Sequence, residues 1–376
     1  MKLLIISHTE HYKTVDGDIV GWGPTVTEIN HLTQIFDAIE HIAMLKEGAA
    51  PPSALAYRSN NIQFTPIPSV GGSGFRDKVN ILLNAPQTLK IIRKALKRTD
   101  VFQFRAPTGI GVYVIPYLVL YTKTKGWFKY AGNWNQKQPP LGYCLQRWLL
   151  KRQSRTVTIN GHWPNQPKHC LSFENPCLTS KDVEAGAYSA QQKSWDEDIE
   201  LCYVGRLESP KGVGRIIDSL KHLDATVAHK IKRLHLIGDG PERTHFEALA
   251  KKISIPVQFY GFLPRQEVFD IYKRCHYFVM PTTASEGFPK VIAEAYNFGC
   301  IPIVSNISAI GHYMKHKATG YLLETPTAEC LALTLSACLS EDPITHKEIL
   351  DKRHTFVKAF SFSHYNERIT NDILKP

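Results

Sequence analysis

The sequence lacks the long apolar runs that membrane spans and secretion signals require. No stretch of its 376 residues approaches the roughly 20 uncharged apolar residues of a transmembrane helix. The apolar segment 2–7 is too short for the apolar part of a signal peptide, and it is typical of a first β-strand. We therefore expect a cytoplasmic protein without a membrane-spanning helix.

The eight cysteines lack the spacing of metal-binding or redox motifs. None of them lies in a Cys-x-x-Cys motif, and Cys170 and Cys177, near His169, have no matching second pair of ligands. We expect reduced, structural cysteines and no metal site.

Acidic residues are scarce in the first half only. Residues 1–178 carry 21 Lys+Arg against 10 Asp+Glu, a net charge of +11, whereas residues 179–376 carry 24 of each. Such a one-sided basic field attracts phospholipid headgroups, a pyrophosphate-linked acceptor or nucleic acid. We expect the basic half to bind an anionic membrane surface or an acceptor, and we expect no nucleic-acid partner. The alternative is a basic face that only aids solubility.

Strands and helices alternate in the first half. The strands predicted from short apolar runs lie at residues 2–7, 62–68, 100–105, 127–132 and 156–160. The helices predicted from amphipathic spacing lie at residues 25–45, 79–98, 111–123 and 141–153. This alternation is typical of a parallel sheet with helices on both faces.

The same pattern restarts after a polar segment at residues 181–200. Further strands are predicted at residues 201–207, 233–240, 257–263, 276–282, 301–306 and 320–324. We therefore expect an α/β chain of two doubly wound, Rossmann-like domains, residues 1–178 and 199–360. The last segment, 361–376, is expected to be a helix that crosses back to the first domain.

Charged and glycine-containing loops follow the strands of the second half. Arg206 and Lys211 lie in the loop after the strand 201–207, where an Arg fork and a Lys point charge suit a pyrophosphate. Gly238 and Gly240 follow the next strand and allow the backbone to approach a ligand closely. Because ligands bind at the carboxyl ends of parallel strands, these loops predict a binding site.

Two glutamates, Glu286 and Glu294, flank the start of a predicted helix. The backbone N–H groups of Gly287, Phe288 and Lys290 would point from the positive end of this helix toward anionic oxygens. A carboxylate on the inner side of such a helix can accept hydrogen bonds from ribose hydroxyls. The alternative is a capping glutamate and a salt-bridged glutamate without any ligand.

Together these motifs resemble the retaining GT-B glycosyltransferases of the GT4 family, the glycosyl transferases group 1. The sequence reads G-R-x-x-x-x-K-G from residue 205, I-G-D-G-P-E-R from 237 and E-G-F-P-x-x-x-x-E-A from 286. The last motif carries the family signature of two glutamates separated by seven residues. The implied GT-B fold has two Rossmann-like domains facing each other across a cleft.

The resemblance implies a role for each matching residue. Arg206 and Lys211 would hold the donor diphosphate and stabilise the leaving nucleotide. Glu286 would contact hydroxyls of the donor sugar, and Glu294 would bind the ribose. The other expected donor contacts are Gly238, Gly240, Gly261, Phe262, Gly287, Phe288, Pro289 and Lys290.

The resemblance also implies the reaction. A sugar, of hexosyl type, would pass with retention from a UDP- or GDP-linked donor to a hydroxyl. No cofactor and no metal are expected, because the cations and the helix end would stabilise the developing charge. Given the basic first half, we expect a lipid-linked or saccharide acceptor in surface polysaccharide or lipopolysaccharide biosynthesis. The protein would then be peripheral at the inner face of the cytoplasmic membrane.

The first half matches the family less closely. Arg105 stands where family members carry a His near the reacting carbon, and Arg cannot act as a general base at neutral pH. We expect Arg105 to bind the sugar, the phosphate or an anionic acceptor, the alternative being an ion pair across the cleft between the two domains. Gly21 and Gly23 fall at the family's Gly-Gly loop and are expected to approach the diphosphate, although Trp22 separates them.

Further residues of the first half have two interpretations. Five residues that follow predicted strands could line the acceptor site or simply pack in the fold: His8, His11, Asn133, Trp134 and His162. Helix 141–155 joins Leu, Trp and Cys to a basic end, which suggests either a membrane-surface helix or an ordinary structural helix.

Two rival functions stay open from the sequence. A nucleotide-sugar epimerase of this fold would turn over the donor without an acceptor, and a basic binding protein would have lost catalysis. The presence of all four donor residues argues against such a loss. The Gly-Ile-Gly at 109–111 follows the wrong strand for a dinucleotide fingerprint, which disfavours a dehydrogenase.

Overall fold

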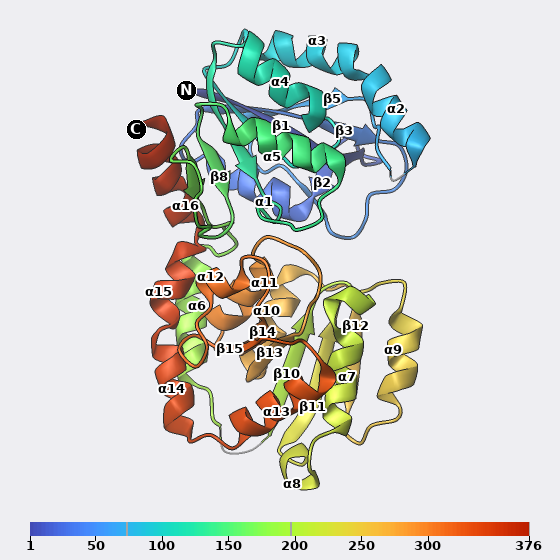
Figure 1. Ribbon diagram of the computed structural model, residues 1–376, viewed down its shortest axis with the longest axis vertical. Helices are drawn as coiled ribbons and strands as arrows, with labels where there is room; N and C mark the ends of the chain where they lie inside the picture. The colour runs from blue at the N-terminus through green and yellow to red at the C-terminus, as the bar shows by residue number, and fades with distance from the viewer. Residues whose placement is uncertain (73, 196–197, 376) are drawn as a thin grey trace. The chain divides into compact units, whose positions relative to one another are not determined.

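The chain folds into two α/β units (Figure 1). The structure, a computed structural model, describes residues 1–72, 74–195 and 198–375. The first unit comprises Met1–Asn175 together with the segment from Tyr365 onward, and the second unit comprises Pro176–His364. The sequence had placed these limits at 178, 199 and 360.

The segment expected as a polar linker, 181–200, contains a helix. In α6 (Ser180–Gln191) the Thr179 side chain accepts from the Asp182 N–H, and the Asp182 carboxylate accepts from the Thr179 N–H. This reciprocal capping satisfies two N–H groups at the helix start, so a polar sequence forms a helix here. Residues 196 and 197 of the expected linker lie outside the described residues.

The first unit is built on a mainly parallel sheet. Its parallel strands follow the order β5 (Ile62–Ile67), β3 (Ala38–Lys46), β1 (Lys2–Lys13), β6 (Val101–Ala106), β7 (Lys125–Tyr130), β8 (Val157–Ile159) and β9 (Cys170–Ser172). Two short antiparallel strands, β2 (Ile19–Trp22) and β4 (Ala54–Ala56), extend the far end of β1.

Both faces of this sheet are apolar, because side chains alternate along each strand. Leu4 and Ile6 belong to a core shared with α3 (Ala85–Leu96), α4 (Gly111–Tyr121) and α5 (Leu141–Lys151). Leu3 and Ile5 belong to the opposite core, shared with α1 (Gly23–Leu32) and the C-terminal segment. The expected doubly wound arrangement is therefore confirmed for this unit.

Two helices predicted for the first half were wrong in extent. The predicted helix 25–45 is the short α1 followed by strand β3, which is buried over nearly all its length. A continuous apolar run fits a buried strand as well as a helix, so spacing alone could not separate them. The predicted helix 79–98 is two helices, α2 (Phe75–Leu83) and α3, and Pro86 lies at the start of the second.

The second unit has a fully parallel sheet among the described residues. Its order is β12 (Val257–Gly261), β11 (Ile231–Ile237), β10 (Ile199–Val204), β13 (Tyr277–Met280), β14 (Ile301–Ser305) and β15 (Tyr321–Leu323). This 3-2-1-4-5-6 order is that of a dinucleotide-binding α/β fold, in which ligands bind at the carboxyl ends of the strands.

The helices of the second unit form two groups (Figure 1). The helix α7 (Val213–Lys221) packs against α9 (Arg243–Ala250) and α13 (Ala328–Leu339). The other group packs around α11 (Lys290–Asn297), and its members are α6, α10 (Arg265–Arg274) and α15 (Arg353–Ala359). The remaining short helices are α8 (Ala225–Ala228), α12 (Ile310–Tyr313) and α14 (Pro343–Asp351).

The C-terminal segment returns the chain to the first unit through α16 (Phe362–Arg368), which continues into a π-helix at Ile369–Leu374. Within the first unit, the Asn366 side chain donates to the His31 carbonyl at 3.0 Å, and Arg368 pairs with Glu174 at 2.9 Å. Among the described residues, none of the helices is both long and apolar enough to cross a membrane.

A buried histidine pair joins strands β1 and β3. The hydroxyl of Tyr57 lies 2.9 Å from His11 Nε2 and 2.6 Å from His41 Nδ1, and both histidines are fully buried. Burial lowers the pKa of His11 to about 4, although its hydrogen bond to the Thr9 carbonyl opposes this shift. The folded protein therefore keeps His11 neutral where an unfolded chain would protonate it.

We predict that this histidine weakens the fold in mild acid. Below pH 6.5 His11 binds a proton in the unfolded chain, whereas in the folded chain it does so only below about pH 4. From about pH 7 to about pH 4.5 the free energy of unfolding should therefore fall by roughly 2 to 3 kcal/mol on account of His11 alone. Urea unfolding at several pH values should show a smaller loss in His11→Gln. The exposed control His229→Gln should keep the wild-type slope, and an equal slope in His11→Gln would contradict the prediction.

Candidate functional site

The carboxyl ends of β10, β11 and β13 meet at one edge of the second sheet, because these neighbouring strands are parallel. The loops 205–212, 238–242 and 281–289 follow these three strands. The structure thus brings together, at one edge, the three motifs that predicted a binding site.

The first two of these loops lock together through their backbones. The Leu207 N–H donates to the Asp239 carbonyl at 3.0 Å. A Cβ atom on Gly238, whose φ is +127°, would lie 1.9 Å from the Gly205 carbonyl oxygen. A Cβ atom on Gly240 would lie 2.3 Å from the Leu207 carbonyl oxygen. Both glycines are therefore needed for packing between the loops, whatever ligand they also meet.

The third loop is tied to the first at Pro210. The Thr283 N–H donates to the Pro210 carbonyl at 2.8 Å, and the Thr282 hydroxyl donates to the same oxygen at 3.2 Å. Gly212, with φ of +98°, passes so close to Pro281 that a Cβ atom would lie 2.5 Å from the Pro281 carbonyl oxygen. The backbone on either side of Lys211 is therefore fixed.

Lys211 and Glu286 form an ion pair between the first and third loops. Their side chains are 20% and 33% exposed, so solvent and ligands can still reach both. Burial lowers the pKa of Lys211, while the nearby Glu208 carboxylate opposes that effect. The Glu286 N–H donates to the Ser308 hydroxyl at 3.2 Å, which holds the loop in place. The structure thus pairs two of the residues assigned to the donor.

Arg206 is the most exposed of the predicted donor residues. Its guanidinium is 69% exposed and lies 3.5 Å from the Glu208 carboxylate, and its backbone carbonyl accepts from the Tyr203 hydroxyl at 2.8 Å. The backbone is therefore anchored while the charged group extends into solvent. A cation in this position can adjust to an anionic ligand.

The helix α11 begins at Lys290, directly after Pro289. In the described chain we find no hydrogen bond donated by the N–H groups of Gly287, Phe288 or Lys290, which therefore fit an anion-binding helix end. The Phe288 ring itself is buried and stacks on Phe360 at 4.7 Å. The side chain of Phe288 thus anchors the loop, and only its backbone can serve a ligand.

Glu294 lies in a separate charged cluster. Its carboxylate is 3.7 Å from the guanidinium of Arg265, which also lies 3.1 Å from Asp182 and donates to the Cys177 carbonyl. Burial raises the pKa of Glu294, and Arg265 and Lys290 oppose that effect. Arg265 is therefore the ion-pair partner of the Glu294 carboxylate. Among the described residues, no hydrogen bond or ion pair joins this cluster to the Lys211–Glu286 pair.

Arg265 and Asp182 were not predicted from the sequence as partners of Glu294. Arg265 follows the Gly261–Pro264 turn after β12, and Asp182 is recognisable only as the capping residue of α6. Neither position lies in a sequence motif that predicts a contact with Glu294.

Gly261 and Phe262 lie at the end of β12. Gly261 has φ of +71°, and its carbonyl accepts from the Gly238 N–H at 2.8 Å, so it joins the same group of loops. The Phe262 side chain is 48% exposed. A half-exposed ring beside these loops offers a flat apolar surface to an aromatic ligand.

Arg105 lies in a buried charge cluster of the first unit. Its guanidinium donates to Glu28 at 2.9 Å and to the Gln103 side chain at 2.9 Å. The ammonium of Lys129 donates to both Glu28 oxygens at 2.7 Å, and the Tyr365 hydroxyl donates to Glu28 at 3.0 Å. Arg105 is therefore held in an ion pair inside the first unit, whereas the alternative expected from the sequence was a pair across the cleft between the domains. A direct catalytic role stays a prediction.

Gly21 and Gly23 do not form a loop. Gly21 is in strand β2 opposite His11, where a Cβ atom would lie 2.2 Å from the His11 ring. Gly23 opens α1, and its N–H donates to the Ser53 carbonyl at 3.2 Å. Both glycines are thus explained by packing, and the N–H of Gly23 is already engaged.

The remaining residues of the first unit divide between surface and core. Trp134 is only 2% exposed and packs edge-on against Tyr130 at 5.0 Å, so the structure favours packing in the fold over an acceptor contact for this residue. Asn133 accepts a hydrogen bond from the Asn135 N–H at 3.0 Å, and His162 is exposed.

His8 lines a surface pocket of about 280 Å³ in the first unit. The other lining residues are Thr9, Glu10, Tyr12, Trp22 and Pro51. Burial lowers the pKa of His8 to about 4, so the imidazole is neutral near pH 7. This pocket combines aromatic rings with a few hydrogen-bonding side chains, as is common in ligand sites.

Solved structures show the class of fold. HepE from Anabaena in complex with UDP superposes with a TM-score of 0.73 at 14% identity over 100% of both chains. The α,α-trehalose-phosphate synthase (UDP-forming) from Burkholderia xenovorans gives 0.74 at 10% identity, also over 100% of both chains. Sucrose-phosphate synthase from Thermosynechococcus elongatus gives 0.73 at 15% identity over 98% of this chain and 97% of that one. The chain has the GT-B fold, with two Rossmann-like units.

Sequence comparison points to one family within this fold. Residues 186–358 match the family model for glycosyl transferases group 1. A glycogen synthase from Mycobacterium tuberculosis is 27% identical over 225 residues, which are 58% of this chain and 54% of the relative. An uncharacterized glycosyltransferase from Haemophilus influenzae is 30% identical over 161 residues, 42% of this chain and 43% of the relative.

These matches span about half the length of the curated relatives. The segment matched by the family model lies within the second unit and contains all three loops of the candidate site. This segment of the chain is therefore similar to group 1 glycosyl transferases.

The packing of the loops gives a direct prediction. Gly238→Ala should lower the free energy of unfolding by about 2 kcal/mol or more, because its φ and its contact with the Gly205 carbonyl both exclude a Cβ atom. Gly214→Ala in α7 is the matched control, since its Cβ atom would make an ordinary 3.4 Å contact with the Phe246 ring of α9. Urea unfolding should show equal or higher stability for Gly214→Ala. Equal stability of the two variants would contradict the prediction.

Proposed function

We propose that the protein is a retaining glycosyltransferase of the GT4 type that takes a sugar from a nucleoside diphosphate sugar. One observation carries the proposal most directly. The Lys211–Glu286 pair lies beside the exposed Arg206 at the carboxyl edge of a 3-2-1-4-5-6 sheet, inside the segment that matches the family model.

The donor would bind through groups that the loops already hold. Arg206 and Lys211 would pair with the diphosphate, and the N–H groups at the start of α11 would add a partial positive charge. Glu294 would accept hydrogen bonds from the ribose, with Arg265 fixing its carboxylate. The Phe262 ring and the Gly261 backbone would meet the base, together with backbone of Gly238 and Gly240.

Uridine is the base that we favour. HepE was solved with UDP and with UDP-glucose, and the trehalose-phosphate synthase is named as UDP-forming. Their fold extends over this whole chain, which is why UDP is the first donor nucleotide to test.

The reaction would proceed by departure of the diphosphate from the face that the acceptor approaches. The bond between the anomeric carbon and the diphosphate oxygen breaks, and the acceptor oxygen bonds to that carbon on the same face. The acceptor proton passes to a diphosphate oxygen. Lys211 and Arg206 would stabilise the charge on the leaving group. Glu286 would part from Lys211 and bind hydroxyls of the donor sugar, and no metal is required in this scheme.

The acceptor and the role of Arg105 are further parts of the proposal. Arg105 would orient polar groups of the first unit through Glu28 and Gln103. The pocket at His8 is our candidate for a hydroxylated acceptor. The acceptor would be lipid-linked or saccharide, as in the assembly of surface polysaccharide or lipopolysaccharide.

The helix α5 supports a location at the cytoplasmic face of a membrane. Leu141, Leu145 and Trp148 are spaced along one helical face and are 90%, 44% and 50% exposed. Lys151 and Arg152 follow at the end of the helix, and the Arg152 guanidinium lies over the Trp148 ring at 4.6 Å. An exposed apolar face beside cations is typical of a helix on an anionic bilayer surface.

We predict that UDP raises the thermal unfolding temperature more than GDP or ADP does. With the matching UDP-sugar, hydrolysis or transfer should release the sugar first in its original anomeric form, as read by proton NMR. The rate should not depend on added Mg²⁺ or Mn²⁺. Turnover of the donor into its epimer would instead identify the epimerase, and no response to any nucleotide would contradict the proposal.

The variant Lys211→Met should lower kcat/KM by roughly 100-fold, because a preorganised cation at the leaving group is lost. Lys221→Met is the matched control, since Lys221 is an exposed lysine of α7 that pairs only with Asp218 among the described residues. Equal activity of the two variants would contradict a role of Lys211 in the reaction.

We also predict binding to vesicles that contain phosphatidylglycerol, decreasing as salt rises. The double variant Leu141→Ser and Trp148→Ser should bind roughly tenfold more weakly, because two apolar side chains no longer enter the bilayer surface. Leu333→Ser is the control, since Leu333 is 73% exposed on α13 of the other unit. Cosedimentation measures all three proteins, and equal binding by the double variant would exclude α5.

A further inference from the structure

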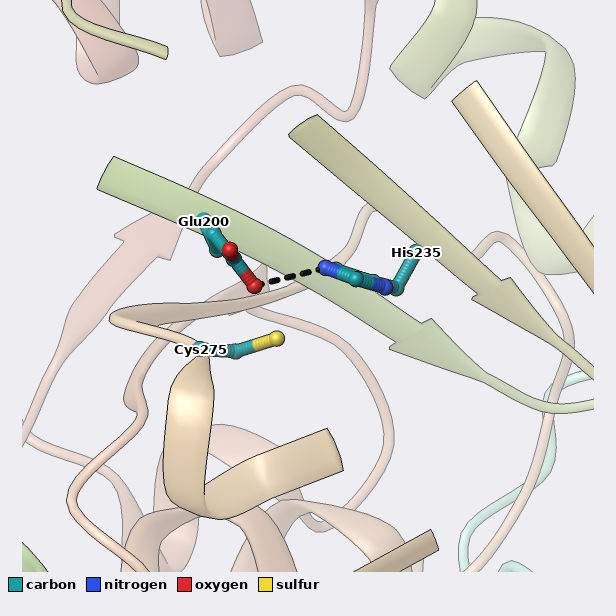
Figure 2. Close-up of side chains that lie close together, drawn as sticks. All are labelled: Glu200, His235 and Cys275. Atoms are coloured by element: carbon teal, nitrogen blue, oxygen red, sulfur yellow. Dashed lines mark hydrogen bonds and ion pairs between the residues drawn. The ribbon is translucent and has the colours of Figure 1, made fainter. Parts of the chain in front are cut away.

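Three side chains with metal-binding atoms converge inside the second unit (Figure 2). Glu200 comes from β10, His235 from β11, and Cys275 from the turn between α10 and β13. The carboxylate, imidazole and thiol atoms all lie within 4.8 Å of one another. His235 and Cys275 are fully buried, and the Glu200 side chain is 16% exposed.

The sheet register places the three groups together. Cys202 pairs with His235 across the two strands, and Glu200 lies two residues before Cys202. The side chains of Glu200 and His235 therefore lie on the same face of the sheet as that of Cys202. Cys275 is brought to this face at the end of α10. There the Lys193 ammonium donates to the carbonyls of Tyr272, at 3.0 Å, and of Cys275. The backbone at Cys275 is therefore fixed.

Hydrogen bonds at both nitrogens hold the imidazole of His235. Its Nε2 atom lies 2.8 Å from a Glu200 oxygen, and its Nδ1 atom lies 2.8 Å from the Tyr260 hydroxyl. Metal-bound histidines commonly use their second nitrogen for such an outer contact, which fixes the ring and its tautomer.

Cys275 differs from the two other buried cysteines nearby. The Cys300 thiol donates to the Tyr272 carbonyl at 3.0 Å, and the Cys202 thiol donates to the Tyr277 carbonyl at 3.6 Å. The Cys275 thiol instead has the neighbouring thiol of Cys202 as its hydrogen-bond partner. Its sulfur points toward the Glu200–His235 pair (Figure 2).

We propose that Glu200, His235 and Cys275 bind a structural zinc ion. Thiolate, imidazole and carboxylate are the three ligand types that zinc takes in proteins, and a water molecule would complete a tetrahedral site. One thiolate and one carboxylate balance the charge of Zn²⁺, which permits an interior location. The partly exposed Glu200 gives the ion an entry path.

This site is distinct from the candidate donor site. Glu200 is the second residue of β10, whereas the donor loops follow the opposite, carboxyl end of that strand. The ion would tie β10 and β11 to the turn before β13 and take no part in sugar transfer. Without a metal, hydrogen bonds already join Glu200, His235 and Tyr260, and the Cys275 thiol contacts the thiol of Cys202.

Metal analysis of the full chain, purified without chelators, tests the site. We expect about one zinc per chain. After chelation and addition of Co²⁺, the protein should show a near-ultraviolet thiolate-to-cobalt charge-transfer band. Cys275→Ser should lose this band, while Cys338→Ser, a buried cysteine of α13 remote from the cluster, should keep it.

The variant Tyr260→Phe provides a second readout that leaves all three ligands in place. It should bind zinc roughly 10- to 100-fold more weakly, because the outer contact of His235 is lost. Wild-type protein with neither bound zinc nor a cobalt band would overturn the proposal, and so would a band that persists in Cys275→Ser. If Cys275→Ser does not fold, the cobalt spectrum of the wild-type protein and the zinc affinity of Tyr260→Phe test the proposed zinc site instead.

Discussion

The backbone contact between the loops that end β10 and β11 is the constraint on which the candidate site depends. Parallel pairing brings the two strand ends to one edge, and Gly238 and Gly240 let the second loop pass against the carbonyls of the first. Only this close approach fixes the chain that carries Arg206 and Lys211. The third loop then adds Glu286 through its contacts with Pro210. The cationic side chains of these loops would otherwise repel each other or change position. The fixed backbone thus preorganises them for an anion.

Much of this edge could be predicted from the sequence. Gly, Pro and charged residues follow short buried strands at 205, 238 and 286, and the physics of parallel sheets places such loops side by side. The doubly wound fold followed from the same alternation. The predictions failed where one pattern fits two structures. The apolar run at 38–46 reads as the end of a helix, yet it is a central strand because β1 and β5 pair with it on both sides.

Contacts between distant residues could not be predicted. Glu294 meets Arg265 and, through it, Asp182, and no local spacing relates these three positions. Arg105 was noticed only as a departure from a family pattern, whereas its partner Glu28 lies 77 residues earlier in the chain. Buried charges of this kind contribute little net stability, but removing one partner is costly because the other charge is left unpaired.

The return of the chain to the first unit has a consequence for its synthesis. The hydroxyl of Tyr365 hydrogen bonds to Glu28 and accepts from Lys129, and Ile369 fills the core beneath α1. A ribosome delivers these residues only after the whole second unit has been translated. Until then, the nascent first unit lacks one hydrogen-bond partner of Glu28 and the Ile369 side chain of its core. The second unit has all its residues before the first unit does, because it ends at His364.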